Sequence, residues 1–176
     1  MIIKQLPNEY INRLGEIDRA EFVRFSYRYQ NGELITQPEN FQVPRWDKDE
    51  VAKHVKQWGA ELERGGILYG ALDGDTLAGV SMLGHRFLGE NQDHMQLYIL
   101  FVSHDYRRQG LATKLMSMVE QAAIERGARY LYISATESES AVGFYRSQGC
   151  VLADKVDPDL YAKEPEDIHM VKKLVN

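Results

Sequence analysis

The sequence predicts a mixed α/β fold, a single domain spanning residues 1–176 around one sheet. Apolar runs of strand length alternate with amphipathic segments of helix length, of which 47–64 and 111–127 are the clearest. Two of the strand runs are joined by Asp73-Gly74-Asp75, which is a strong hairpin signal. A chain of 176 residues is long enough for one domain with its own core. We therefore expect one α/β domain without internal repeats.

The first third of the chain is expected to contain one strand and two helices. A strand is predicted over 2–6, and a helix over 8–29 because its apolar side chains keep roughly helical spacing. Gln30-Asn31-Gly32 ends that helix with turn chemistry. Residues 31–46 are expected to form an irregular loop wrapped over the domain, because its aromatic side chains need cover. Asp47 with Glu50 three residues later predicts the start of the helix over 47–64.

The rest of the chain is expected to alternate strands and helices. Three strands are predicted before a helix that runs to about Gly127, and after a further strand a second, shorter helix ends at Gly149. A long acidic loop joins the last two strands. The expected order is β–α–α–β–β–β–α–β–α–β–β, with strands over 67–72, 77–88, 95–102, 130–135, 150–155 and 169–175 and the later helices over 111–127 and 138–148.

Composition excludes several classes of protein. The net charge of −5 argues against a general affinity for nucleic acid. No apolar run is long enough to cross a bilayer and the first residues lack a signal-peptide pattern, so we expect a cytoplasmic protein without membrane contact. The single cysteine, Cys150, fits a reducing compartment. The five histidines show no paired ligand spacing, so no metal is expected.

The segment 97–112 predicts a strand, a short polar turn and the start of a helix, and this arrangement suits an anion. The first turn of a helix leaves its N–H groups unsatisfied, and the helix dipole adds positive charge there. Phosphate oxygens fit that need. Gly110 and Ala112 allow close approach of a bulky group, and Arg107 and Arg108 add fixed charge. An ordinary strand–turn–helix connection with a solvated arginine pair would give the same spacing.

Two motifs resemble those of the GCN5-related N-acetyltransferase (GNAT) family. Arg107-x-x-Gly110-x-Ala112 after an apolar strand is similar to the acyl-CoA signature Q/R-x-x-G-x-G/A. Further on, the segment 138–150 resembles N-x-x-A-x-x-F-Y-x-x-x-G-F. Ser138 stands where asparagine is usual and Cys150 where phenylalanine is usual, whereas the matching positions are Ala141, Phe144, Tyr145 and Gly149.

The resemblance implies a GNAT-type fold in which two central strands part to admit acetyl-CoA as cosubstrate. Phe101 and Val102 would supply main-chain hydrogen bonds to the pantetheine, and Ser138 would contact it with a shorter side chain than asparagine. The pyrophosphate would lie against the turn and first helical residues, which are Arg107, Arg108, Gln109, Gly110, Leu111, Ala112 and Thr113.

Direct acyl transfer to an amine needs a proton acceptor, a donor for the oxyanion and an acid for the thiolate. The Phe101 or Val102 backbone is the expected oxyanion donor, and the resemblance makes Tyr145 the expected acid. Histone-modifying members carry a glutamate where this chain has Gln96, which cannot accept a proton but can orient a water. The sequence does not identify the proton acceptor. The candidates are ordered water and four side chains, which are His94, Glu137, Glu164 and His169.

The resemblance implies an acceptor site between the loop after the first helix and the loop before the last strand, which here is the acidic loop 157–167. Negative charge there would concentrate a cationic amine, although a loop that only aids solubility has the same composition. Tyr27, Tyr29, Glu33 and Glu164 are the predicted substrate contacts.

Three functions follow from these expectations. The first is an N-acetyltransferase acting on a primary amine of a small or medium polar molecule. The second is a transferase acting on a peptide or protein N-terminus or lysine, and the third is a non-catalytic acyl-CoA-binding module. The oligomeric state stays open, a homodimer included.

Overall fold

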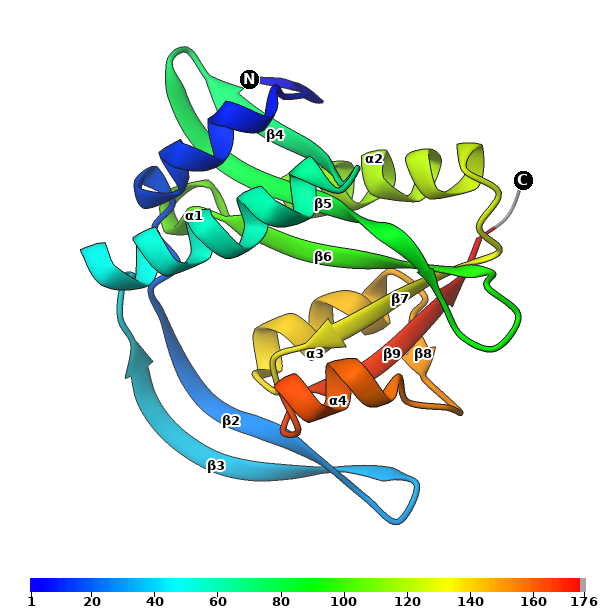
Figure 1. The fold of residues 1–176 in the computed structure, drawn as a ribbon. Helices are drawn as coiled ribbons and strands as arrows, with labels where there is room; N and C mark the ends of the chain where they lie inside the picture. Colours follow the sequence, from blue (N-terminus) through cyan, green and yellow to red (C-terminus); the bar gives the residue numbers. More distant parts are fainter. Residues whose placement is uncertain (175–176) are drawn as a thin grey trace.

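A computed structural model describes residues 1–174, which form a twisted sheet with helices on both faces and a separate hairpin (Figure 1). The main sheet has the strand order β1-β4-β5-β6-β7-β9-β8. Its strands pair antiparallel except for β6 and β7, which are parallel. This mixed sheet confirms the predicted α/β class. The strands are β1 (Ile2–Gln5), β4 (Ile67–Asp73), β5 (Thr76–Leu88), β6 (His94–Val102), β7 (Tyr130–Ala135), β8 (Val151–Leu152) and β9 (Ile168–Lys173).

Separate apolar clusters lie on the two faces of the sheet. Trp58 and Leu62 of α1 belong to the cluster on one face, whereas Leu115 and Val119 of α2 belong to the cluster on the other. Tyr145 of α3 joins the α2 cluster, so α2 and α3 share a face. The helices are η1 (Asn8–Glu16, a 3-10 helix), α1 (Lys48–Glu63), η2 (His104–Tyr106, a 3-10 helix), α2 (Leu111–Glu125), α3 (Glu139–Ser147) and α4 (Pro158–Lys163).

The predicted start of α1 is confirmed at the level of single atoms. The Asp47 side chain accepts a hydrogen bond from the Glu50 backbone N–H at 2.8 Å, and the Glu50 side chain accepts one from the Asp47 backbone N–H at 2.8 Å. This reciprocal pair satisfies two of the N–H groups that a helix start leaves open.

The predicted helix over 8–29 is wrong, and so is the predicted loop over 31–46. Only η1 is helical there, and the chain then forms the hairpin of β2 (Glu21–Gln30) and β3 (Glu33–Val43). From Val23 to Tyr29, aromatic and branched residues alternate with polar ones, which is the period of a strand. Asn31 and Gly32 both have positive φ, 52° and 89°, as a tight hairpin turn requires. The turn predicted at Gln30-Asn31-Gly32 is therefore present, but it joins the strands β2 and β3 and does not end a helix.

The C-terminal part also differs from expectation in detail. The acidic loop 157–167 contains α4, which Asp157 caps by accepting from the Leu160 N–H at 3.0 Å. The strand predicted over 150–155 is only the two residues of β8. The last strand is β9, and the predicted end at Val175 lies outside the described residues.

The strands β6 and β7 pair only over their first residues. His94, Met95 and Gln96 lie opposite Tyr130, Leu131 and Tyr132, and no further pairs are present in the described chain. Beyond Gln96 the two strands part, as the splayed arrangement predicts.

A bulge in β6 begins where the strands part. Leu97 pairs with Leu83 and Ile99 with Met82, which leaves Tyr98 without a partner on β5. Leu97 packs in the α2 cluster but Ile99 packs in the α1 cluster, because the extra residue inverts the alternation of side chains.

No helix among residues 1–174 has the length and apolar character needed to cross a membrane.

Candidate active site

The open edge of β6 presents peptide groups toward the gap between β6 and β7. The Ser103 N–H donates to the Ala78 carbonyl at 2.9 Å, so by the alternation of an antiparallel pair the peptide groups of Val102 and Leu100 point away from β5. The same alternation turns the peptide groups of Phe101 toward β5. The register thus supports Val102 as a main-chain contact and favours Leu100 over Phe101 as the second.

The N-terminus of α2 is open to a ligand. Gly110 has φ 77° and caps the helix without a side-chain hydrogen bond. A Cβ added at Gly110 would meet nothing within 4 Å among the described residues. Arg108 also has a positive φ of 61°, and Arg108 and Gln109 are exposed. Unsatisfied N–H groups of the first helical turn therefore face open space beside a fixed positive charge, which suits a diphosphate.

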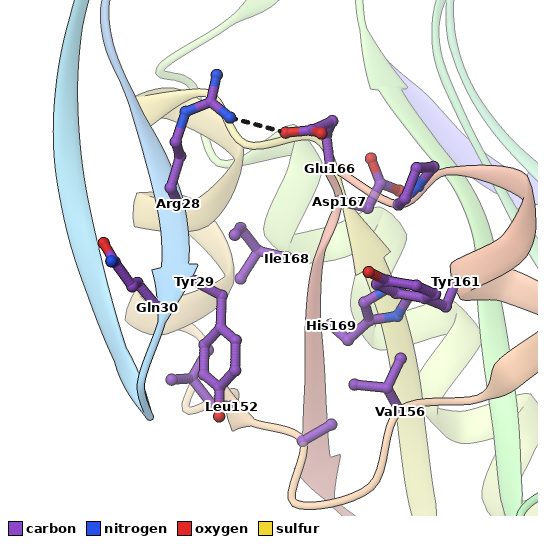
Figure 2. A pocket seen from close by; sticks show the side chains of 12 residues that line it. Arg28, Tyr29, Gln30, Leu152, Val156, Tyr161, Glu166, Asp167, Ile168 and His169 are labelled. Carbon is purple, nitrogen blue, oxygen red and sulfur yellow. Dashed lines mark hydrogen bonds and ion pairs between the residues drawn. The ribbon is translucent and has the colours of Figure 1, made fainter.

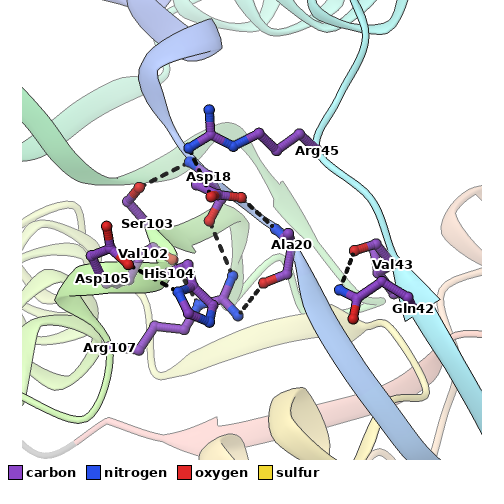
Figure 3. A network of polar contacts seen from close by, with 10 residues as sticks. All are labelled: Asp18, Ala20, Gln42, Val43, Arg45, Val102, Ser103, His104, Asp105 and Arg107. Carbon is purple, nitrogen blue, oxygen red and sulfur yellow. Dashed lines mark hydrogen bonds and ion pairs between the residues drawn. The ribbon is translucent and has the colours of Figure 1, made fainter.

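The side chain of Arg107 ties this turn to the segment that leads into β2 (Figure 3). Its guanidinium donates to the carbonyl oxygens of Val102 at 3.0 Å, Ala20 at 3.0 Å and Asp18 at 3.3 Å. The Ser103 hydroxyl accepts from the Asp18 N–H at 2.9 Å in the same network. The charge of Arg107 thus stabilises the backbone beside the gap, in addition to any contact with an anion.

The predicted residues of α3 lie on the opposite side of the gap. Ser138 is the N-cap of α3, where its hydroxyl accepts from the Ala141 N–H at 3.3 Å, and it forms an isolated bridge with Ser26 of β2. The strand β2 therefore runs from Arg107 on one side of the gap to Ser138 on the other.

Tyr145 is buried, with 8% of its surface exposed, and lies against Phe144. Burial raises the pKa of its hydroxyl well above the ordinary value, and the nearby Cys150 and Asp167 act in the same direction. The hydroxyl is therefore protonated at neutral pH, as a proton donor must be.

A cavity of about 600 Å³ lies between α1 and α4 and includes Gln96 and Tyr98, the β6 residues at the start of the gap. Burial, reinforced by the charge of Glu61, raises the pKa of Tyr98. The charged side chains at this cavity are of both signs, so it suits a polar occupant. Its lining consists of Glu61, Arg64, Gly84, His85, Arg86, Gln96, Tyr98, Asp159, Leu160, Ala162 and Lys163.

Glu61 and His85 form a pair in this cavity that the sequence analysis missed. Both the backbone N–H and the Nδ1 atom of His85 lie 2.7 Å from Glu61 Oε1. Glu61 has only 5% of its surface exposed. One signal was available, because an acid at position 61 lies next to the apolar stripe formed by Trp58 and Leu62 of α1.

A second cavity of about 380 Å³ lies on the other side of α4, between the β2–β3 hairpin and β9 (Figure 2). It is lined by Tyr29, Tyr161 and His169 among others, and by no residue of β6 or β7 within 1–174. Glu166 at its rim is paired with Arg28 at 2.9 Å. The cavity beside α1, in contrast, borders the parted strands directly through Gln96 and Tyr98.

Asp167 connects the second cavity to the gap. It accepts a hydrogen bond from the Ser134 hydroxyl of β7 at 2.7 Å. Burial raises its pKa from 3.8 to about 6, and Glu164 and Glu137 contribute.

The four predicted substrate residues do not gather in one place. Tyr29 lines the second cavity, Tyr27 packs edge-on against Phe25, and Glu33 is exposed at the hairpin turn. Glu164 follows α4, and its charge tends to raise the pKa of His54 on α1, a pKa that burial lowers. None of the four is among the residues that line the cavity between α1 and α4.

The residues considered as bases are also dispersed. His94 lies at the closed end of β6, where its Nδ1 is 2.8 Å from Asp93 Oδ1 and its ring stacks on Tyr130. His169 Nδ1 lies 2.8 Å from the Tyr132 hydroxyl, and burial lowers the pKa of His169. Glu137 lies where β2 crosses, its carbonyl accepting from the Tyr27 N–H at 2.7 Å.

Comparison with known proteins agrees with the fold. The family model described as Acetyltransferase (GNAT) family matches residues 26–150. No curated protein matches the chain. A structure of nourseothricin acetyltransferase is similar at TM-score 0.73 and 20% identity, covering 99% of this chain and 98% of that one.

Two further solved structures are similar over nearly the whole chain. A putative streptothricin acetyltransferase from Bacillus anthracis str. Ames, in complex with acetyl coenzyme A, has TM-score 0.63 and 18% identity, covering 97% of this chain and 94% of that one. The ribosomal-protein-S18-alanine N-acetyltransferase from Escherichia coli has TM-score 0.62 and 16% identity, with 99% and 94% covered. The family match spans well over half of the sequence, and the chain accordingly belongs to the GNAT family of acetyl-CoA-dependent N-acetyltransferases.

Proposed function

We propose that this enzyme transfers the acetyl group directly to a primary amine of a small or medium polar molecule held in the acceptor cavity between α1 and α4. The observation that carries the proposal is the position of that cavity. It is bordered by Gln96 and Tyr98, which lie where β6 leaves β7 and where the bulge of β6 begins. An acceptor there would lie beside the open edge of β6.

The residues around the gap fit acetyl-CoA. The N–H groups after Gly110, with Arg108 beside them, would hold the pyrophosphate, because that helix start is uncapped and open. Val102 and Leu100 would bind the pantetheine through their outward peptide groups. Ser138 and Thr113 would add hydroxyl contacts at the rim. When bound, acetyl-CoA supplies a thioester whose carbonyl carbon an amine can attack.

Two side chains would then act on the reacting groups. Tyr145 would give its proton to the departing thiolate, since burial keeps its hydroxyl protonated. Gln96 would orient the amine or a water by hydrogen bonding, because an amide both donates and accepts. A peptide N–H at the bulge of β6 would stabilise the negative charge that develops on the carbonyl oxygen.

The cavity favours a polar acceptor over an apolar one. Asp159 and Glu61 are its acids, and Arg64, Arg86 and Lys163 are its bases, with Arg86 and Asp159 paired at 3.2 Å. Glu164, at the end of α4 next to Lys163, adds negative charge suited to a cationic amine. The names of the nourseothricin and streptothricin enzymes, which share the fold, refer to small molecules.

Release of free thiol from acetyl-CoA, followed over a panel of amines, tests this function. The panel should contain glucosamine, spermidine, free lysine and short peptides with free N-termini. We expect turnover with at least one small amine and weaker turnover with the peptides. Turnover with peptides alone would contradict the proposal in favour of a peptide acceptor. The irregular segment 31–46 that would have supported a peptide groove is instead mainly the strand β3.

A further inference from the structure

We propose that His85, oriented by Glu61, accepts the proton that the acceptor amine loses before it attacks the thioester. This inference rests on the proposed function, because it needs the amine in the cavity between α1 and α4. It assigns a catalytic role to His85 and a positioning role to Glu61.

The reaction requires such a group for a chemical reason. A primary ammonium has a pKa of about 10, so at neutral pH nearly all of the amine carries the proton that blocks its lone pair. Gln96, the polar residue of β6 at the start of the gap, is an amide and cannot accept that proton. A basic side chain from another element must therefore lie within reach.

The Glu61–His85 pair has the geometry of an oriented base. Glu61 Oε1 lies 2.7 Å from His85 Nδ1, so a carboxylate there holds the proton on Nδ1 and leaves the lone pair of the neutral ring on Nε2. The second contact, from the His85 backbone N–H at 2.7 Å, fixes the position of the carboxylate and compensates for its burial. His85 keeps 27% of its side chain exposed, so solvent and ligands can reach the imidazole.

The pair lies next to Gln96, with Gly84 between them. A Cβ built on Gly84 would lie 3.4 Å from Gln96 Cβ and 3.4 Å from Glu61 Oε1. The carboxylate of Glu61, from α1, therefore lies beside the strand that carries Gln96, and it acts through the imidazole of His85.

The atoms and protons of the step balance. The ammonium gives one proton to His85 Nε2, and the freed lone pair forms the N–C bond to the acetyl carbon as the C–S bond breaks. Tyr145 gives its proton to the departing sulfur and recovers one from the nitrogen, which becomes a neutral amide. The imidazolium then returns its proton to solvent.

Other charged or titratable groups also line this cavity. They are Arg64 on α1, Arg86 on β5, Tyr98 on β6, and Asp159 and Lys163 on α4.

The test compares His85→Ala and His85→Gln with a matched control, His104→Ala. His104 is also a histidine whose Nδ1 lies close to a carboxylate, that of Asp105 at 3.0 Å, but it is exposed on η2 and is not among the residues that line this cavity. With whichever of glucosamine, spermidine or lysine the unsubstituted enzyme acetylates fastest, we expect kcat to fall about 10²- to 10⁴-fold in both His85 variants. Acetyl-CoA affinity, measured by calorimetry, should not change, and the control should keep its kcat.

Two readouts separate a base from a merely structural residue. Added imidazole should restore part of the activity of His85→Ala, and the acidic limb of the pH profile of kcat/KM should disappear in His85→Gln. Glu61→Gln should lose about 10- to 100-fold in kcat and keep a shifted acidic limb, as expected of a positioning residue. Melting temperatures show whether each variant is folded.

Several results would overturn the inference. Unchanged kcat in folded His85→Gln would do so, and so would a loss of activity with neither imidazole rescue nor a changed pH profile. If Asp167→Asn, and not His85→Gln, removed the acidic limb, Asp167 would be the base. If the unsubstituted enzyme bound acetyl-CoA but acetylated none of the amines, the proposed function itself would fail, which is a different result.

Discussion

The Nε atom of Arg107 donates a hydrogen bond to the carbonyl oxygen of Val102, 3.0 Å away. The contact joins the turn before α2 to the end of the open strand β6. The other guanidinium nitrogens donate to the carbonyl oxygens of Ala20 and Asp18, so one side chain joins the turn before α2 to both the end of β6 and the segment 18–20. An arginine that the sequence pattern links to phosphate therefore also organises the protein surface on which the phosphate would lie.

Replacing Arg107 by alanine should destabilise the fold as well as weaken cofactor binding. Three hydrogen bonds to carbonyl oxygens would be lost, which corresponds to roughly 1–3 kcal/mol. We expect a lower melting temperature and a higher KM for acetyl-CoA. Arg108→Ala is the matched control, because Arg108 is exposed, and it should change the KM but leave the melting temperature unaltered. Equal melting temperatures for the two variants would contradict the network.

The left-handed conformation of Gly110 should be required for acetyl-CoA binding. An alanine at φ 77° costs about 1–2 kcal/mol of folding stability, and its Cβ would also enter the open space at the start of α2 in which the pyrophosphate would lie. Gly110→Ala should therefore lower affinity about tenfold. Gly110→Glu should lower it further by charge repulsion. Gly127→Ala is a control of the same kind, since Gly127 has φ 90° at the other end of α2 and open space around it. It should lose stability without losing affinity for coenzyme A, measured by calorimetry.

Removing the hydroxyl of Tyr145 should slow the chemical step. Tyr145→Phe keeps the packing of the ring against Phe144, so the fold and the KM for acetyl-CoA should be preserved. We expect kcat to fall about 10²-fold or more. Tyr130→Phe, at the closed end of the sheet beside His94, should leave kcat unchanged. A kcat for Tyr145→Phe within twofold of the parent would remove the assignment of the acid.

Asp167 should make the protein more stable in mild acid than at neutral pH. Its pKa is raised from 3.8 to about 6 in the folded protein, so its contribution is fully present below pH 3.8 and is lost as the pH rises through 6. Asp167→Asn removes the cost of a buried charge, and at pH 7.5 it should stabilise the protein by about 1–3 kcal/mol. The gain should shrink toward pH 5, as melting curves across this range would reveal. A constant difference between the two proteins would contradict the shifted pKa.

The negative charge after α4 should attract a cationic acceptor. Replacing Glu164, Glu166 and Asp167 together by their amides should raise the KM for spermidine about tenfold, because a cation is no longer concentrated there. Glu166→Gln alone should have little effect, since Arg28 already neutralises that carboxylate. Unchanged KM in the triple variant would show that the loop only aids solubility.

Some of these features could be predicted because their signals are local. The capping box of α1, the Asp73-Gly74-Asp75 turn and the strand–turn–helix around Gly110 each depend on residues within a few positions of one another. The segment 21–30 shows the limit of that approach. Its spacing fits a helix loosely and a strand well, and pairing with β3 decides between them.

The sequence by itself determined the family motifs, the α/β class and the open helix start at Gly110, where we predict that an acyl-CoA binds, because short-range chemistry sets turns, caps and helix starts. Only the tertiary structure decided that β6 bulges at Tyr98, that β2 crosses the gap, and that Glu61 of α1 meets His85 of β5 beside Gln96. The physical reason is that these features depend on which strand pairs with which and on how a helix packs against a sheet. Such contacts join distant parts of the chain and leave little trace in local spacing.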